Sequence, residues 1–132
     1  MASSTQVKTV TVDNGVKVFY RESVPASAKD ISSLPIILLL HGFPSSSFQF
    51  RNLIPLLATK YRVVAPDLPG YGFTVVPEER KYRYNFESIT NTITAFLDAL
   101  GIKEFSVYIF DYGAPTALRY VTLGSVMLPA VD

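Results

Sequence analysis

The stretch Phe105–Arg119, FSVYIFDYGAPTALR, decides how the rest of the chain is interpreted. Its first half, Phe105–Phe110, is β-branched and aromatic, without charge, glycine or proline, which predicts a short strand buried on both faces. Gly113 and Ala114 then open a run of helix formers, and Pro115 suits a first helical turn, where a missing N–H is tolerated. Asp111 therefore lies on the corner between a strand and a helix.

Two interpretations of this corner remain open. A sharp strand–nucleophile–helix turn is the geometry of a nucleophile elbow, which needs a small residue two positions later, here Gly113. The position two residues earlier is usually small as well, and Ile109 departs from that pattern. The alternative is an ordinary turn in which Asp111 caps the helix. In both cases the N–H groups and the dipole of the following helix would stabilise the carboxylate.

The composition indicates one folded domain. The chain has 132 residues, of which 48% are hydrophobic and 13% aromatic, so it can build a core. The formal net charge is +1 and residues 78–83 mix both signs, so nucleic acid is not an expected partner. There is no Cys, which excludes disulfides, thiolate metal sites and Cys nucleophiles. We expect no metal and no cofactor.

We also expect no membrane segment. The N-terminus MASSTQVKTV lacks the apolar stretch of a secretory signal. The longest apolar run, residues 34–40, is far shorter than the ~20 residues needed to span a bilayer. A soluble, cytoplasmic protein with a disordered N-terminus over residues 1–6 is expected. The chain contains a single histidine, His41, so any mechanism with a histidine base must use that residue or go without.

The remaining pattern alternates strands and helices, which predicts an α/β fold with an N-terminal hairpin and a mainly parallel sheet flanked by helices. The predicted elements are a hairpin of residues 7–12 and 16–20, strands at 35–40 and 61–65, a helix at 48–58 kinked or divided at Pro55, and a helix capped by Asn85 and ended by Gly101. In such sheets, sites form at the carboxyl ends of the strands. Residues 41–44, 66–70 and 111–113 follow three of these ends, and their convergence favours a catalytic Asp111.

Three motifs together closely resemble the α/β-hydrolase superfamily: LLLHGFPSSSFQFRNLIPLL, YRVVAPDLPGYGFT and YIFDYGAPTALR. Within it, the chain resembles the branch of epoxide hydrolases and haloalkane dehalogenases, whose nucleophile is Asp. The resemblance covers roughly residues 7–120. It implies that residues 7–123 form the N-terminal part of this fold, lacking the cap domain and the C-terminal strands, and that residues 124–132 are an atypical tail.

The resemblance also implies roles for individual residues. Asp111 would be the nucleophile that attacks a substrate carbon and forms an alkyl-enzyme ester. The backbone N–H groups of Phe43 and Tyr112 would form the oxyanion hole used when water hydrolyses that ester. The residues that would position the loops are His41, Gly42, Pro44 and Gly113. Asp67 would order the turn in which it lies. Phe43, Phe73 and Tyr112 are candidates for lining the pocket, or are core residues.

The implied substrate is a small-molecule electrophile, an epoxide or an ester-like compound. Haloalkane dehalogenases hold the departing halide with indole N–H groups, commonly from a Trp directly after the nucleophile. This chain has Tyr112 there and no Trp, which favours epoxide opening over dehalogenation. In the epoxide hydrolase branch, two cap tyrosines protonate the opening ring, and none of the eight tyrosines here can be assigned to that role.

The resemblance further implies an incomplete catalytic apparatus. In this family the acid and the base histidine come late in the chain, and residues 120–132 do not resemble that continuation. A general base contributes ~10²–10⁴-fold, so we expect no turnover by this chain alone, and enzymatic activity is left open. The alternatives are a truncated or splice-variant remnant that is at most a binding module, and a half-enzyme completed by a partner chain. Residues 105–110 would form an exposed apolar edge, open to homo- or hetero-association and aggregation.

Overall fold

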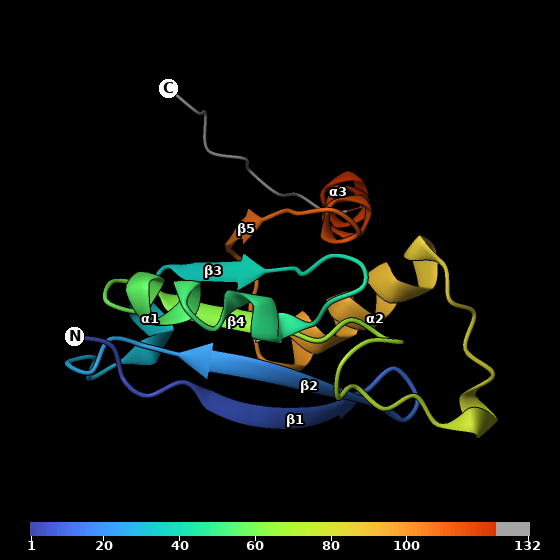
Figure 1. Cartoon of the computed structure of the whole chain (residues 1–132), viewed down its shortest axis with the longest axis horizontal. Helices are drawn as coiled ribbons and strands as arrows, with labels where there is room; N and C mark the ends of the chain where they lie inside the picture. Colours follow the sequence, from blue (N-terminus) through green and yellow to red (C-terminus); the bar gives the residue numbers. More distant parts are fainter. Residues whose placement is uncertain (124–132) are drawn as a thin grey trace.

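Five strands form one mixed sheet in the computed structural model, which describes residues 1–123 (Figure 1). The strands are β1 (Gln6–Val12), β2 (Val16–Ser23), β3 (Ile36–Leu39), β4 (Arg62–Pro66) and β5 (Ser106–Tyr108), in the spatial order β1-β2-β4-β3-β5. β3 pairs in parallel with β4 and β5, whereas β2 is antiparallel to β1 and β4. The predicted hairpin is thereby confirmed, as is the parallel pairing among the three strands that follow it.

Helices cover both faces of this sheet. Within residues 1–123 the α-helices are α1 (Leu53–Leu57), α2 (Phe86–Ala99) and α3 (Gly113–Leu123), with short 3₁₀ turns at Ile31–Ser33, Ser47–Phe50 and Glu78–Arg80. α1 lies in front of the sheet and α2 behind it in Figure 1. Along β3, Leu38 belongs to the core on the α2 side and Leu39 to the core on the α1 side. Because side chains alternate along a strand, a continuous apolar run fills both cores.

α2 forms where its apolar spacing and caps predict it. The Asn85 side chain accepts a hydrogen bond from the Ser88 N–H at 2.8 Å, which satisfies a free donor of the first turn. The apolar side chains recurring every three or four residues are buried, among them Ile89, Ile93, Phe96 and Leu97. Gly101 has φ +68° and follows the last helical turn, where a residue without Cβ adopts this conformation at low cost.

The predicted helix at 48–58 is divided rather than continuous. A 3₁₀ turn, Ser47–Phe50, comes first, and the Ser46 hydroxyl accepts a hydrogen bond from the Phe48 N–H at 3.3 Å. α1 follows as a separate segment in which Pro55 is the third residue. The first N–H groups of a helix have no intrahelical partner, so the proline costs no hydrogen bond there. The prediction that Pro55 marks a new segment is confirmed.

β5 differs most from its prediction. It spans three residues at the edge of the described sheet, and the exposed fractions of Tyr108, Ile109 and Phe110 are 48%, 45% and 49%. Phe105 and Val107 pack partly against the core, but within residues 1–123 only β3 lies beside β5. The prediction of a strand buried on both faces is therefore wrong, whereas the exposed apolar edge is present in this part of the chain.

The structure also differs from the prediction at the N-terminus. Ala2 pairs with Pro25, and the Ser3 N–H donates a hydrogen bond to the Val24 carbonyl at 2.8 Å. Residues 1–6, predicted to be disordered, find these partners because the chain beyond β2 runs beside them. The predicted atypical tail, residues 124–132, lies outside the described residues. No helix in residues 1–123 is long and apolar enough to cross a membrane.

Candidate active site

The loops after β3, β4 and β5 meet at the carboxyl edge of the sheet. The loop after β3 reaches the β5 corner, because the Phe43 N–H donates a hydrogen bond to the Asp111 carboxylate at 2.9 Å. It also reaches the loop after β4, where the Leu68 N–H donates to Nε2 of His41 at 2.9 Å. The predicted convergence of three strand ends is confirmed.

Asp111 occupies a sharp corner between β5 and α3. Its φ of +47° lies in the left-handed region, which costs an ordinary residue roughly 1–2 kcal/mol. Two short backbone hydrogen bonds close the corner, from the Gly113 N–H to the Phe110 carbonyl at 2.8 Å and from the Ala114 N–H to the Asp111 carbonyl at 3.1 Å. A strained strand-to-helix turn of this kind exposes the side chain at its tip. Asp111 is accordingly exposed.

The Asp111 carboxylate is held by one of its two oxygens. Oδ1 accepts hydrogen bonds from the Phe43 N–H at 2.9 Å and from the Tyr112 N–H at 2.8 Å. A capping carboxylate would accept from the second or third N–H of the helix, so the cap interpretation of Asp111 does not fit these partners. Oδ2 accepts no hydrogen bond from residues 1–123.

Two glycines allow the backbones to approach at this corner. A Cβ at Gly42 would lie 2.5 Å from the Cβ of Asp111, and a Cβ at Gly113 would lie 2.5 Å from the Leu40 carbonyl oxygen. Both distances are well inside van der Waals contact, so neither position accommodates a side chain without displacement. The expectation of a small residue at position 113 agrees with this packing. Ile109 departs from the elbow pattern, in which this position is usually small. The residue is 45% exposed, so the larger side chain is accommodated at the surface.

His41 is fully buried between two loops and uses both ring nitrogens. Its Nε2 accepts the Leu68 N–H, so Nδ1 carries the proton and donates to the Gly42 carbonyl at 3.0 Å. Burial lowers the pKa of the ring, since a charged imidazolium would lose its hydration. A neutral ring with two fixed partners fits a positioning role and leaves no nitrogen free to act as a base.

Asp67 is a second buried carboxylate with local partners. It accepts hydrogen bonds from the Ser47 N–H at 2.7 Å and the Phe73 N–H at 2.8 Å. Its backbone carbonyl also accepts the Thr74 hydroxyl at 2.6 Å. These contacts join the loop after β3 to the loop after β4, which agrees with the expected ordering role. Pro44, the remaining loop residue of the predicted site, directly follows Phe43 through a cis peptide bond.

Aromatic rings surround the corner. The Phe43 and Tyr112 rings lie 5.4 Å apart, and Phe86 meets Tyr112 edge to face at 5.3 Å. Phe73 instead contacts Phe19 at 5.1 Å, so it is not part of this aromatic group. A cavity of about 300 Å³ opens beside Tyr112, lined by Pro69, Gly70, Tyr71, Tyr84, Asn85, Phe86, Ile89 and Tyr112.

Most of this lining was missed by the sequence prediction. Phe86 belongs to the predicted helix that Asn85 caps, and the sequence analysis predicts no role for Tyr71 or Tyr84. The available signal was position: Tyr71 follows the carboxyl end of β4, and Phe86 opens a helix whose N-terminus faces the same edge. Tyr84 had no such signal.

The chain matches a known protein family and several known proteins. The family described as alpha/beta hydrolase fold matches residues 35–124. The chain is 52% identical over 110 residues to an uncharacterized hydrolase of Saccharomyces cerevisiae, covering 83% of this chain and 35% of that protein. It is 33% identical over 131 residues to a haloalkane dehalogenase of Psychrobacter cryohalolentis, covering 91% of this chain and 41% of that protein.

The fold is also similar to that of a solved structure. An epoxide hydrolase from Vigna radiata superposes with a TM-score of 0.75 at 33% identity, covering 89% of this chain and 34% of that one. The chain thus spans 35% and 41% of the length of the two curated relatives above.

Proposed function

The chain belongs to the α/β-hydrolase fold family, and on that basis we propose that Asp111 is the nucleophile of an epoxide-opening hydrolase. The observation that carries the proposal is the pair of backbone N–H groups, from Phe43 and Tyr112, that donate to Oδ1 of Asp111. Two N–H groups converging on one carboxylate oxygen stabilise negative charge at that position. They also hold the carboxylate through Oδ1, while Oδ2 accepts no hydrogen bond from residues 1–123 and is the oxygen proposed to react.

The reaction begins with attack by Oδ2 of Asp111 on a ring carbon of the epoxide. The new C–O bond forms as the carbon–oxygen bond of the ring breaks, and its electron pair stays on the ring oxygen, which takes a proton from water. The product is a hydroxyalkyl ester of Asp111. Oδ1 becomes the carbonyl oxygen of this ester, and attack by hydroxide on the ester would place negative charge on it. The N–H groups of Phe43 and Tyr112 already lie where that charge develops.

The second half of the reaction needs a base that these residues do not supply. His41 is the only histidine in the 132 residues, and both of its nitrogens are occupied in the loops. Loss of general base catalysis slows a step by ~10²–10⁴-fold. We therefore propose that this chain alone forms the ester and accumulates it, and that turnover requires a base from residues outside this sequence or from a partner chain.

Dehalogenation is the second candidate, because one relative is named a haloalkane dehalogenase. The same oxygen would attack a carbon–halogen bond and release halide. A halide needs donors at the leaving position, and Tyr112, directly after the nucleophile, packs its ring against Phe43 and Phe86. An epoxide keeps its leaving oxygen attached and needs no halide site, so epoxide opening is the better fit.

Incubation of the purified chain with a reactive epoxide tests this proposal. Intact-mass spectrometry should show one adduct per chain with the added mass of the epoxide, while diol forms no faster than with the Asp111→Asn variant. Continuous diol formation by the unmodified chain would contradict the missing base. Absence of an adduct would contradict the nucleophile and would support the alternative of a non-catalytic binding module.

A further inference from the structure

The cavity of about 300 Å³ beside Tyr112 has an aromatic, uncharged lining. Tyr71, Tyr84, Phe86 and Tyr112 supply four rings, and the other lining residues are Pro69, Gly70, Asn85 and Ile89. None of these side chains is charged. Ligand sites usually span ~300–1,000 Å³, so this cavity suits one small group rather than a whole large ligand.

The cavity shares walls with the surroundings of Asp111. Tyr112 lines it and also donates its backbone N–H to Oδ1 of Asp111. Phe43, the other donor, holds its ring 5.4 Å from Tyr112 and 6.3 Å from Tyr71. Burial raises the pKa of Tyr71, and the nearby charges of Tyr112 and Asp111 add to the effect. A substrate that reacts at Asp111 would therefore place a neighbouring substituent against these rings.

The outer wall of the cavity is built from Tyr84. Its ring lies on the backbone of Gly70, with ring carbons 3.1 Å and 3.2 Å from the place where a Cβ would stand. Its other neighbour is the ring of Tyr82, at 5.0 Å. The position of Tyr84 thus depends on the missing side chain at Gly70 and on the placement of Tyr82.

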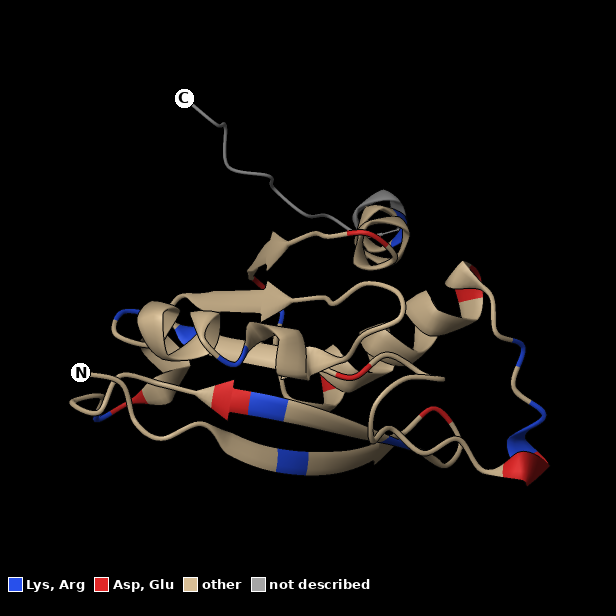
Figure 2. Cartoon of the chain, viewed as in Figure 1, with Lys and Arg blue, Asp and Glu red and all other residues tan. Residues whose placement is uncertain are grey.

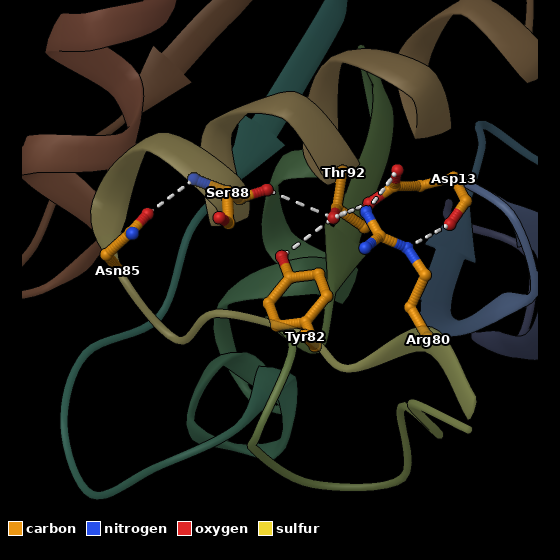
Figure 3. Close-up of polar contacts among 6 residues, drawn as sticks. All are labelled: Asp13, Arg80, Tyr82, Asn85, Ser88 and Thr92. Atoms are coloured by element: carbon orange, nitrogen blue, oxygen red, sulfur yellow. Dashed lines mark hydrogen bonds and ion pairs between the residues drawn. The ribbon is translucent and has the colours of Figure 1, made fainter. Parts of the chain in front are cut away.

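Tyr82 is held by a polar network that joins three distant parts of the chain (Figure 3). Its hydroxyl bonds to the hydroxyl of Thr92 on α2 at 2.7 Å, and Thr92 in turn donates to Asp13 in the β1–β2 turn at 2.5 Å. Asp13 also forms an ion pair with Arg80 at 2.9 Å. The loop that carries Tyr84 is therefore anchored, and binding to a preformed wall loses less conformational entropy.

We propose that this cavity binds an uncharged aryl substituent of the substrate, so that the chain acts on aryl-substituted electrophiles. Binding of the aryl group does not depend on the proposed reaction at Asp111. Only the identity of the reacting group, an electrophile, rests on that proposed function. Aromatic groups pack edge to face or offset against other rings, and four rings line this site. An anionic group would meet the Asp111 carboxylate and no cationic side chain in the lining, so its desolvation would be uncompensated.

Unreactive probes separate this inference from the nucleophile assignment. The unmodified, ¹⁵N-labelled chain is titrated with 1-phenylethane-1,2-diol, its cyclohexyl counterpart, mandelate and 2-phenylethylammonium, with amide shifts recorded by NMR. The phenyl diol should bind tightest and shift Gly70, Asn85, Phe86 and Ile89. Residues 103–106, which line a separate cavity of about 620 Å³, should not shift. Tighter binding of the cyclohexyl or ammonium probe, or shifts confined to other residues, would overturn the proposal, whether or not Asp111 forms an ester.

Two variants sharpen this experiment. Tyr84→Ala removes an exposed ring from the cavity wall and should weaken binding of the phenyl diol about 3–10-fold. Tyr108→Ala removes an exposed ring from β5, away from the cavity, and should leave the affinity unchanged. Equal affinity of Tyr84→Ala and the unmodified chain would contradict the aryl site. Asp111→Asn should reduce the difference in binding affinity between mandelate and the phenyl diol, because it removes the negative charge. An unchanged difference in affinity would contradict the electrostatic exclusion of anions.

Discussion

The backbone N–H of Phe43 donates a hydrogen bond of 2.9 Å to Oδ1 of Asp111, although 68 positions separate the two residues in the chain. This contact joins the loop after β3 to the corner after β5. It forms only because Gly42 brings the two backbones together, since a Cβ at that position would lie 2.5 Å from the Cβ of Asp111. The reactivity proposed for Asp111 therefore depends on the packing of a residue that carries no functional group.

Gly42→Ala should slow ester formation at Asp111 by at least about tenfold, because the added methyl separates Phe43 from Oδ1 and removes one donor. The rate of adduct formation with an epoxide, followed by intact mass, measures the effect. Gly101→Ala is the matched control, since its φ is +68° but a Cβ there would meet nothing within 4 Å. The control should lose stability through backbone strain and keep its labelling rate. Similar labelling rates for both variants would contradict the role of Gly42.

Thr92→Val should destabilise the fold by about 1–3 kcal/mol, because it leaves the Tyr82 hydroxyl and the Asp13 carboxylate without their shared partner (Figure 3). Thr94→Val is the control: Thr94 lies on the same helix and donates only to the Thr90 carbonyl among the described contacts. Urea denaturation of both variants gives the comparison. If Thr94→Val costs as much as Thr92→Val, the network contributes nothing beyond helix propensity.

The single histidine should titrate below its usual range. Burial lowers the pKa of His41 from 6.5, so below that pH the unfolded chain binds a proton that the native chain lacks. The free energy of unfolding should therefore fall as the pH drops from about 6.5, with a limiting slope of about 1.4 kcal/mol per pH unit. A proton NMR titration of the native ring, together with urea denaturation at several pH values, measures both quantities. A ring that titrates at or above 6.5 would contradict its burial with two fixed partners.

Glu22 should contribute in a different pH range. Burial would raise the pKa of Glu22, but hydrogen bonds from Lys8 and Arg62 outweigh it and hold the pKa below 4.5. Its stabilising contribution is present above 4.5 and is lost as the pH falls through the lower native value. Glu22→Gln should flatten the stability profile in that acidic range and leave the range near 6.5 unchanged. A loss of the transition near 6.5 in this variant would contradict the assignment to His41.

The exposed strand β5 should promote association of the chain. Tyr108→Lys places a charge on this edge, where unpaired backbone groups otherwise invite further strand pairing, and should shift sedimentation toward monomer. Leu56→Lys on α1 is the control, because Leu56 is 71% exposed but lies on a helix. Equal effects of the two substitutions would point to general surface hydrophobicity rather than to the strand edge.

The sequence was sufficient to predict that the loops of the candidate site meet at one edge of the sheet. The apolar run at Leu38–Leu40 and the loop residues that follow it mark a strand end, and parallel strands bring such ends to one edge. Asp111 could be placed at that edge because a strand pattern stops and a helix pattern starts on either side of it. The two N–H groups of the predicted oxyanion hole, from Phe43 and Tyr112, both donate to Oδ1, but their role in a reaction stays a prediction.

Features that depend on distant contacts could not be predicted. The aromatic cavity needs Tyr84, whose position is set by Gly70 and by a network that reaches back to Asp13 in the hairpin turn. No local pattern links these residues. The burial of residues 105–110 was predicted from their apolar character, but burial requires neighbours on both sides, and within residues 1–123 only β3 is adjacent.

The most direct test of the central claim compares two carboxylates in one labelling experiment. The unmodified chain, Asp111→Asn and Asp98→Asn are exposed to the same reactive epoxide, and peptide mapping locates the ester. Asp98 lies on α2, away from the two N–H donors, so Asp98→Asn should label at the rate of the unmodified chain. Asp111→Asn should lose the adduct. Equal labelling of all three proteins, or an ester located at another carboxylate, would contradict the assignment of Asp111 as the nucleophile.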